Sequence, residues 1–180
     1  SAPLRIICGV AVGDFQRVKP FADEFLAHVE FELRLGAVHF LSDHPNVAIP
    51  LKRELTDADH EDYYRQTLAL VTGCDIDVLA HLGVHKRYLE EQPDESHCRG
   101  LLTDIFQVMV ERRIALEINF SSLRKPYARL LPDLWQIELY RSLGGKLFSI
   151  GSDAHLLEHF DLNYEQLPPW LFSGEMEFPL

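Results

Sequence analysis

The segment Gly151-Ser152-Asp153-Ala154-His155 places a carboxylate and an imidazole two residues apart. In extended backbone, residues two apart point to the same side, so Asp153 and His155 can share a site. Zinc, iron and manganese all accept carboxylate and imidazole ligands. A short Asp-x-His pair is a weak motif, however, and a surface turn in which Asp153 caps the next helix explains it equally well.

The pair follows the apolar run Leu147–Ile150, which predicts a buried strand. His39 lies in the predicted strand 33–41, and His81 lies near the end of the predicted strand 76–82. A lone histidine in an apolar context is more often a hydrogen-bonded core residue than a ligand. In parallel α/β folds, however, ligands bind at the carboxyl ends of the strands. Two histidines and an Asp-x-His pair at such ends therefore favour a metal or catalytic site.

Short apolar runs alternate with amphipathic stretches along the whole chain. The apolar runs predict strands over residues 4–12, 33–41, 76–82, 114–120 and 146–150. The amphipathic stretches predict helices over residues 18–32, 57–71, 98–112 and 132–143. This rhythm predicts an α/β fold with a parallel sheet, either barrel-like or open. The first helix is expected to bury one apolar face: Phe21, Phe25, Leu26 and Val29.

Length and composition limit the class of protein. The 180 residues suit one domain over 1–180, in which residues 167–180 form an extended arm packed by Trp170, Leu171 and Phe172. A net charge of −11 excludes a nucleic-acid partner, which would need a basic surface. No apolar run is long enough to span a membrane. Three scattered cysteines without a CxxC pair favour the reducing cytoplasm.

Five segments together resemble a known family, the PHP (polymerase and histidinol phosphatase) metallophosphoesterases, most closely its histidinol-phosphatase type. The resemblance covers roughly residues 4 to 160 and is carried by residues 36–40, 77–82, 115–119, 123–126 and 148–155. It implies an incomplete or distorted (β/α) barrel with mostly parallel strands. It also implies divalent metal ions (Zn, Fe or Mn) and hydrolysis of a small phosphomonoester similar to histidinol phosphate.

The resemblance also implies roles for individual residues. His39 and His81 are similar to two ligands of one metal, Asp153 to a ligand of a neighbouring metal, and His155 to a ligand of a third. Arg124 is similar to a residue that binds the phosphate of the substrate, as a guanidinium can with two hydrogen bonds. From the sequence alone, a solvated loop arginine is an equally good interpretation of Arg124.

Two departures from the family pattern concern the metal ligands. Family members carry a His-x-His pair on the first strand, whereas no histidine precedes His28 here, and Ala11 stands where a bridging glutamate is expected. Catalytic zinc ordinarily has three protein ligands, so each site falls short. A catalytically inactive relative that serves as a binding or oligomerising module is therefore the alternative, and an amidohydrolase-type hydrolase is a third hypothesis. The first strands of the family's barrel, which carry the His-x-His pair, are missing here. Their absence predicts an exposed sheet edge and hence homo-oligomers.

The remaining polar residues have ordinary interpretations. His60 is expected to be solvated or half-buried on its helix, and Glu117 to pair with a buried base. His85, four residues after His81, is expected in a loop, with the mouth of the same site as the alternative.

Overall fold

The computed structural model describes residues 5–161, 163–172 and 176–179 and contains one open sheet of parallel strands. The strands lie in chain order: β1 (Gly9–Gly13), β2 (Leu33–Ala37), β3 (Val78–Leu79), β4 (Ala115–Asn119) and β5 (Phe148–Gly151). All four strand pairs are parallel, and the sheet is not closed into a barrel. The expected α/β architecture, an incomplete barrel with parallel strands, is therefore confirmed.

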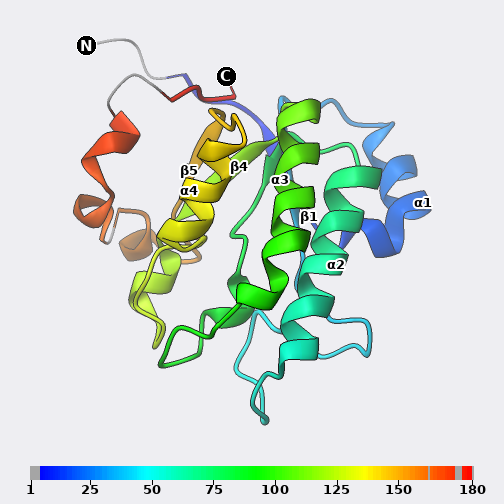
Figure 1. Cartoon of the computed structure of the whole chain (residues 1–180). Helices are drawn as coiled ribbons and strands as arrows, with labels where there is room; N and C mark the ends of the chain where they lie inside the picture. The colour runs from blue at the N-terminus through cyan, green and yellow to red at the C-terminus, as the bar shows by residue number, and fades with distance from the viewer. Residues whose placement is uncertain (1–4, 162, 173–175, 180) are drawn as a thin grey trace.

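A helix follows each of the first four strands in the chain. These helices are α1 (Phe15–Leu26), α2 (Asp57–Gly73), α3 (Arg99–Arg112) and α4 (Leu134–Ser142). Helix α2 contacts both α1 and α3, and α3 also contacts α4, so the four helices form a row. Figure 1 shows α2, α3 and α4 in front of the sheet, with α1 at the right. Because each strand is joined to its parallel neighbour through a helix, all the carboxyl ends of the strands point the same way.

The two faces of the sheet have different surroundings. On β4, Leu116 and Ile118 belong to the hydrophobic core. The alternate residues of this strand, Glu117 and Asn119, line a cavity. On β1, Val10 and Val12 pack against the core, whereas Ala11 lines the same cavity. Alternate residues of a strand point to opposite faces. One face of the sheet is therefore buried in the hydrophobic core, and the other opens into the cavity.

Helix α2 begins with a capping box, which explains why the helix starts directly after Thr56 and close to Asp59. Thr56 caps the main-chain nitrogen of Asp59, and the Asp59 carboxylate accepts a hydrogen bond from the main-chain nitrogen of Thr56 at 2.7 Å. Arg53 donates two hydrogen bonds to the same carboxylate. This arrangement satisfies main-chain donors that the first helical turn would otherwise leave unpaired.

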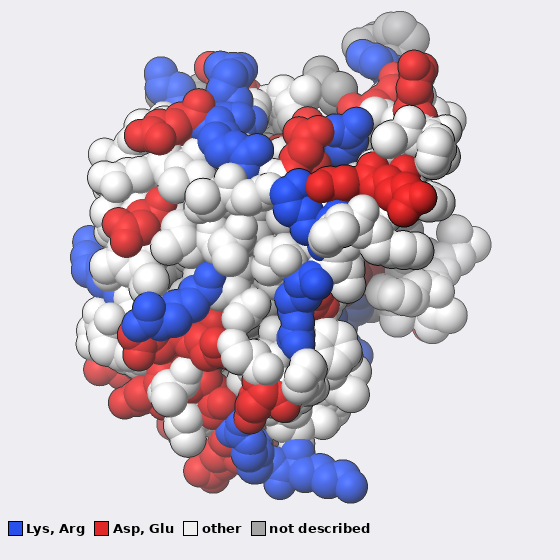
Figure 2. All heavy atoms as spheres, turned by 90° about the vertical axis from the view of Figure 1, so that its right-hand side faces the viewer, with Lys and Arg blue, Asp and Glu red and all other residues white. Residues whose placement is uncertain are grey.

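Of the four residues expected on the buried face of the first helix, Leu26 is buried and the other three are exposed. Helix α1 buries Phe15, Ala22 and Leu26, whereas Phe21 is 74 % and Phe25 51 % exposed, and Val29 is exposed as well. The helix begins three residues earlier than expected and has a kink at Val18, so a different stripe of the helix faces the core. Figure 2, which views the molecule from the α1 side, shows an uncharged area at the centre of this face among charged side chains.

The C-terminal segment is only partly the extended arm that the prolines predicted. Residues Pro169–Phe172 form a 3-10 helix in which Leu171 is buried, and Glu177 pairs with Leu147 beside the start of β5. Residues 173–175 and 180 of the expected arm lie outside the described residues, as does Leu4 of the first expected strand. Across the described residues, every helix is too short or too polar to cross a bilayer.

Candidate functional site

A cavity of about 680 Å³ lies on the open face of the sheet, at the carboxyl ends of its strands. The five residues that the sequence indicated, His39, His81, Arg124, Asp153 and His155, all line it. His39 comes two residues after β2, His81 two residues after β3, and Asp153 two residues after β5. The parallel sheet therefore brings together side chains that are far apart in the sequence.

The two histidines lie side by side in this cavity, with 5.2 Å between their ring centroids. His81 is buried, its Nδ1 atom has no hydrogen-bond partner, and its main-chain nitrogen donates to Glu117 Oε2 at 2.6 Å. Burial lowers the pKa of His81 to about 4, and the nearby His39 and Arg87 act in the same direction. The His81 ring is therefore held neutral, which is the form that binds a metal ion.

His39 is positioned by the first strand and by an acidic residue after it. Asp14 Oδ1 accepts a hydrogen bond from the main-chain nitrogen of His39 at 3.0 Å, and Asp14 Oδ2 lies 3.6 Å from His39 Nδ1. Burial raises the pKa of Asp14, but the hydrogen bonds from His39 outweigh it and lower the pKa. A Cβ atom at Gly13 would lie 2.9 Å from His39 Nδ1, so glycine leaves room for the ring.

The carboxylate and the arginines form a second polar group in the cavity. Arg87 Nη2 donates to Asp153 Oδ2 at 2.6 Å and to Ser121 Oγ at 2.9 Å. Arg124 Nη2 donates to the carbonyl oxygen of Ser152 at 3.0 Å, while its Nη1 atom is buried without a partner. Burial lowers the pKa of Arg124. Two guanidinium groups therefore face the cavity, and each has a buried donor without a partner, Arg87 Nε and Arg124 Nη1, which suits an anionic ligand.

The structure places His155 at the rim of the cavity and gives Glu117 other partners than the expected base. The His155 side chain is 81 % exposed, and its Nδ1 atom contacts the carbonyl oxygen of Asp153 at 3.0 Å, so it lies at the mouth of the cavity. Glu117 does not pair with a buried base; it accepts hydrogen bonds from the His81 main chain and from Asn119 Nδ2 at 3.0 Å. Burial raises the pKa of Glu117. The contact between Glu117 and His81 could not be predicted from the sequence, because His81 follows the neighbouring strand β3.

The cavity offers the donor types of a metal site, but the set is incomplete. His39 and His81 provide two neighbouring imidazoles, and the unpartnered Nδ1 atom of His81 fits a metal ligand. Within the described residues, however, the four expected ligands do not form a group of three donor atoms spaced for one ion. Ala11 also lines the cavity and has no donor atom. The chain therefore provides two ligands for one ion rather than the three that catalytic zinc ordinarily has.

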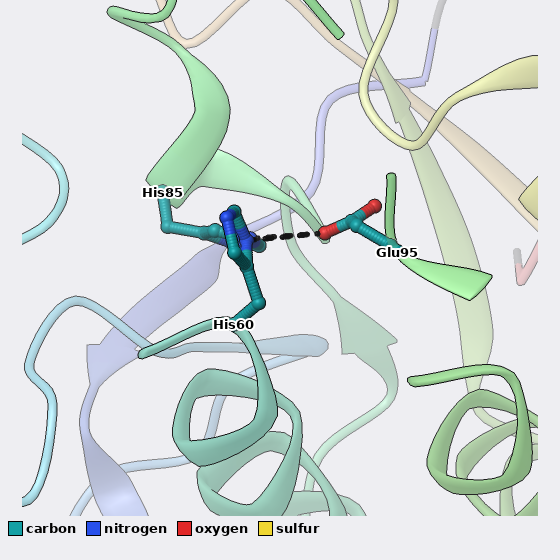
Figure 3. A group of neighbouring side chains, drawn as sticks. All are labelled: His60, His85 and Glu95. Atoms are coloured by element: carbon teal, nitrogen blue, oxygen red, sulfur yellow. Dashed lines mark hydrogen bonds and ion pairs between the residues drawn. The ribbon is translucent and has the colours of Figure 1, made fainter. Parts of the chain in front are cut away.

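A second cluster lies in the interior, away from the cavity lining. Figure 3 shows His60 from α2, His85 from the 3-10 helix η1 (Val84–Lys86), and Glu95, which precedes the 3-10 helix η2 (Ser96–Cys98). His85 Nε2 lies 2.9 Å from His60 Nδ1 and 3.1 Å from Glu95 Oε1. His60 is 3 % exposed, so the solvated or half-buried position expected for it is wrong. His85 lies in the connection between β3 and α3, as expected, but it is 4 % exposed and does not line the main cavity.

Charged and hydroxyl groups surround this cluster. Lys86 Nζ donates to Glu95 Oε2 at 2.7 Å and to Asp133 Oδ2 at 2.5 Å, and Tyr64 donates to Glu95 Oε1 at 2.7 Å. Burial raises the pKa of Glu95, but the hydrogen bonds from the two histidines and the Lys86 charge outweigh it and hold the pKa low. Burial also lowers the pKa of His85 to about 4. The cluster therefore holds a buried carboxylate beside the neutral ring of His85.

The turn after His81 carries functional residues that the sequence reasoning missed. Arg87 lines the main cavity and Lys86 lies in the interior, although the two are consecutive. Tyr88 lines both the main cavity and a second cavity of about 350 Å³, which His85 also lines. Consecutive cations directly after a strand-end histidine are the signal that could have found Arg87.

Comparisons with known proteins agree with this fold. No family model matches the chain. The chain is 36 % identical over 117 residues to a Thermotoga maritima protein named "Probable histidinol-phosphatase", which covers 65 % of this chain and 49 % of that protein. It is 25 % identical over 167 residues to a protein of the same name from Clostridium acetobutylicum. This match covers 89 % of this chain and 65 % of that protein. The chain therefore spans about half to two thirds of these relatives.

A solved structure of histidinol phosphate phosphatase from Lactococcus lactis, complexed with zinc, L-histidinol and phosphate, has a TM-score of 0.79 at 19 % identity. The match covers 98 % of this chain and 69 % of that one. The open parallel α/β sheet is thus a PHP-type fold. The resemblance to histidinol phosphatases that the sequence motifs indicated is confirmed by the names and structures of these relatives.

Proposed function

We propose that the cavity at the carboxyl ends of the strands is the site of a metal-dependent phosphoesterase that acts on a small phosphomonoester similar to histidinol phosphate. The proposal rests on one observation: side chains that follow β2, β3, β4 and β5 meet in a single cavity that contains both imidazoles and guanidinium groups. The relatives named histidinol-phosphatase and the related structure that holds phosphate support it.

In this proposal, His39 and His81 hold one divalent ion, and Asp153 and His155 each contribute to a neighbouring ion. Zinc, iron or manganese would polarise the phosphoryl oxygens and lower the pKa of a bound water. Arg124 binds the phosphate through its unpaired Nη1 donor. Arg87 holds the Asp153 carboxylate at 2.6 Å and adds a second positive charge to the cavity wall. The protein residues therefore bind and orient a phosphate dianion.

A second candidate is a catalytically inactive relative that keeps the cavity for binding. Two observations favour it: Ala11 has no donor atom at the cavity wall, and the Arg87 guanidinium already neutralises Asp153. In this case the arginines would still bind a phosphorylated ligand, because they do not depend on a complete metal site. Hydrolysis, by contrast, would be absent.

The test compares the purified chain with a His39→Ala/His81→Ala double variant. Phosphate release from histidinol phosphate is measured with added manganese or zinc, and binding of inorganic phosphate is measured by calorimetry. Turnover that the double variant loses supports the phosphoesterase. Phosphate binding without turnover in either protein supports the inactive relative, and the absence of both activities contradicts both candidates.

A further inference from the structure

The interior cluster of His60, His85 and Glu95 has the spacing of a metal site. The three contacts between His60 Nδ1, His85 Nε2 and Glu95 Oε1 measure 2.9, 3.1 and 3.5 Å. Zinc binds imidazole nitrogen and carboxylate oxygen at about 2.0–2.2 Å. One ion can therefore contact all three atoms at once. Among the described residues, this is the group whose three donor atoms converge in this way.

Without an ion, one proton must be shared within this triangle of atoms. A proton on His85 Nε2 serves both His60 Nδ1 and Glu95 Oε1, which lie 3.5 Å from one another, and Glu95 Oε1 also accepts a hydrogen bond from Tyr64. A proton on His60 Nδ1 instead leaves His85 Nε2 facing the carboxylate oxygen as a second acceptor at 3.1 Å. With protons on both rings, two donors would face one another at 2.9 Å. A cation at the centre satisfies all three atoms with both rings neutral.

We propose that His60, His85 and Glu95 bind a divalent transition-metal ion of the zinc class at a buried site separate from the main cavity. Two imidazoles and a carboxylate suit zinc or iron better than magnesium or calcium. Burial favours neutral imidazole, the form that binds metals. The cavity of about 350 Å³ that His85 and Tyr88 line gives an ion a route to the ligands.

The ion would act as a structural clamp for the turn that carries Arg87. It joins α2 through His60, the η1 helix through His85, and the segment before α3 through Glu95. His85 is two residues before Arg87, whose guanidinium holds Asp153 and Ser121 in the main cavity. Loss of the ion would therefore loosen a positioning residue of the main cavity without removing any group from it.

The experiment measures metal content and metal position in the intact chain, independently of any phosphatase activity. After incubation with zinc and gel filtration, the bound metal is quantified in the wild-type chain, His85→Gln, Glu95→Gln and the His39→Ala/His81→Ala variant. His97→Gln is the matched control, because His97 is an exposed histidine near Glu95. We expect one equivalent of zinc to stay bound in the His39→Ala/His81→Ala variant and in the His97→Gln control. His85→Gln and Glu95→Gln should each lose this equivalent.

Crystals of the zinc-loaded wild-type chain provide a second measurement that does not depend on a variant folding. An anomalous difference peak between His60, His85 and Glu95 is expected. Zinc retained by both folded interior variants, or no peak at this position, would overturn the proposal. Failure of the proposed function is seen separately, as no turnover of histidinol phosphate by the wild-type chain while zinc stays bound at the interior cluster.

Discussion

Gly151 is a residue at which the close packing of the site excludes any side chain. A Cβ atom there would lie 1.9 Å from Glu117 Oε1, the carboxylate that holds the main chain of His81. We predict that Gly151→Ala lowers the free energy of unfolding by about 2 kcal/mol, because overpacking a buried site forces its neighbours to shift. Urea denaturation measures the change.

The matched control is Gly100→Ala in helix α3. No atom lies within 4 Å of a Cβ placed at Gly100. Alanine should leave the free energy of unfolding unchanged or raise it by up to about 1 kcal/mol, because alanine is the better helix former. Equal effects at the two glycines would contradict the close contact at Glu117.

A second prediction at the scale of single residues concerns Arg124 and the binding of phosphate. Arg124→Met removes the unpartnered Nη1 donor beside the cavity but keeps much of the side-chain volume. A charge-assisted hydrogen bond contributes about 1.5–3 kcal/mol, so the affinity for inorganic phosphate should fall roughly tenfold or more. Calorimetry with phosphate measures the effect. Arg65→Met, at an exposed arginine that pairs with Glu61, should bind phosphate as the wild-type chain does.

At the scale of the element, the start of α2 depends on the charge of Asp59. The side chain of Arg53 and the capping contacts with Thr56 outweigh burial and hold the pKa of Asp59 well below its usual value. An aspartate whose pKa is lowered in the folded state stabilises the protein above its unfolded pKa. That stability is lost as the pH falls through the lower, folded pKa.

We therefore predict that Asp59→Asn lowers the free energy of unfolding by about 1 kcal/mol at neutral pH, a typical value for a helix cap. The difference from the wild-type chain should stay constant between pH 5 and 8, where the carboxylate is charged in both states, and shrink below about pH 4. Urea titrations at several pH values test this. A difference that grows in acid would show that the charge of Asp59 does not stabilise the helix.

The elements themselves were largely predictable from the sequence, whereas the contacts between them were not. The five strands and the four helices follow from local apolar periodicity, which each segment shows alone. The exposed face of α1 could not be predicted, because Phe21 and Phe25 have the spacing of a core stripe and yet both are exposed in the structure. Local patterns do not record which stripe of a helix meets the sheet.

The candidate site likewise contains residues that the sequence predicted and residues that only the packing of the elements brings together. His39, His81 and Asp153 were found because each follows a recognisable strand. The interior cluster was missed because His60 lies 25 residues from His85, on a helix without an obvious reason to bury a histidine. Only the packing of α2 against the turn after β3 brings the two rings together.

At the scale of the whole molecule, buried neutral histidines make stability depend on pH. The pKa of His81 and of His85 is lowered to about 4, mainly by burial, whereas unfolded histidine titrates near 6.5. Between these values the unfolded chain binds more protons, so stability rises with pH. We predict that, with chelator present, the free energy of unfolding falls as the pH drops from 6.5 to 4.

The expected slope is about 1.4 kcal/mol per pH unit for each ring at its steepest. Urea denaturation at pH 7, 6 and 5 measures it, and His28→Gln, at an exposed histidine, should leave the profile unchanged. A flat profile would show that the two rings are accessible to protons in the folded chain.

Self-association remains a prediction from the sequence. The outer side of β1 has no strand beside it in the described part of the chain, and Phe21 on the neighbouring helix α1 is 74 % exposed. Light scattering after gel filtration measures the mass directly, and a monomer at all concentrations would contradict the prediction.

The ring of Tyr88 forms part of the wall between two compartments, the main cavity and the smaller one beside His85. An occupant large enough to push this ring aside on one side would narrow the space on the other. By thermodynamic reciprocity, each occupant would then weaken the binding affinity of the other by the same factor. One aromatic side chain thus makes the two compartments competitors for volume, although no residue of the interior cluster other than His85 lines either of them.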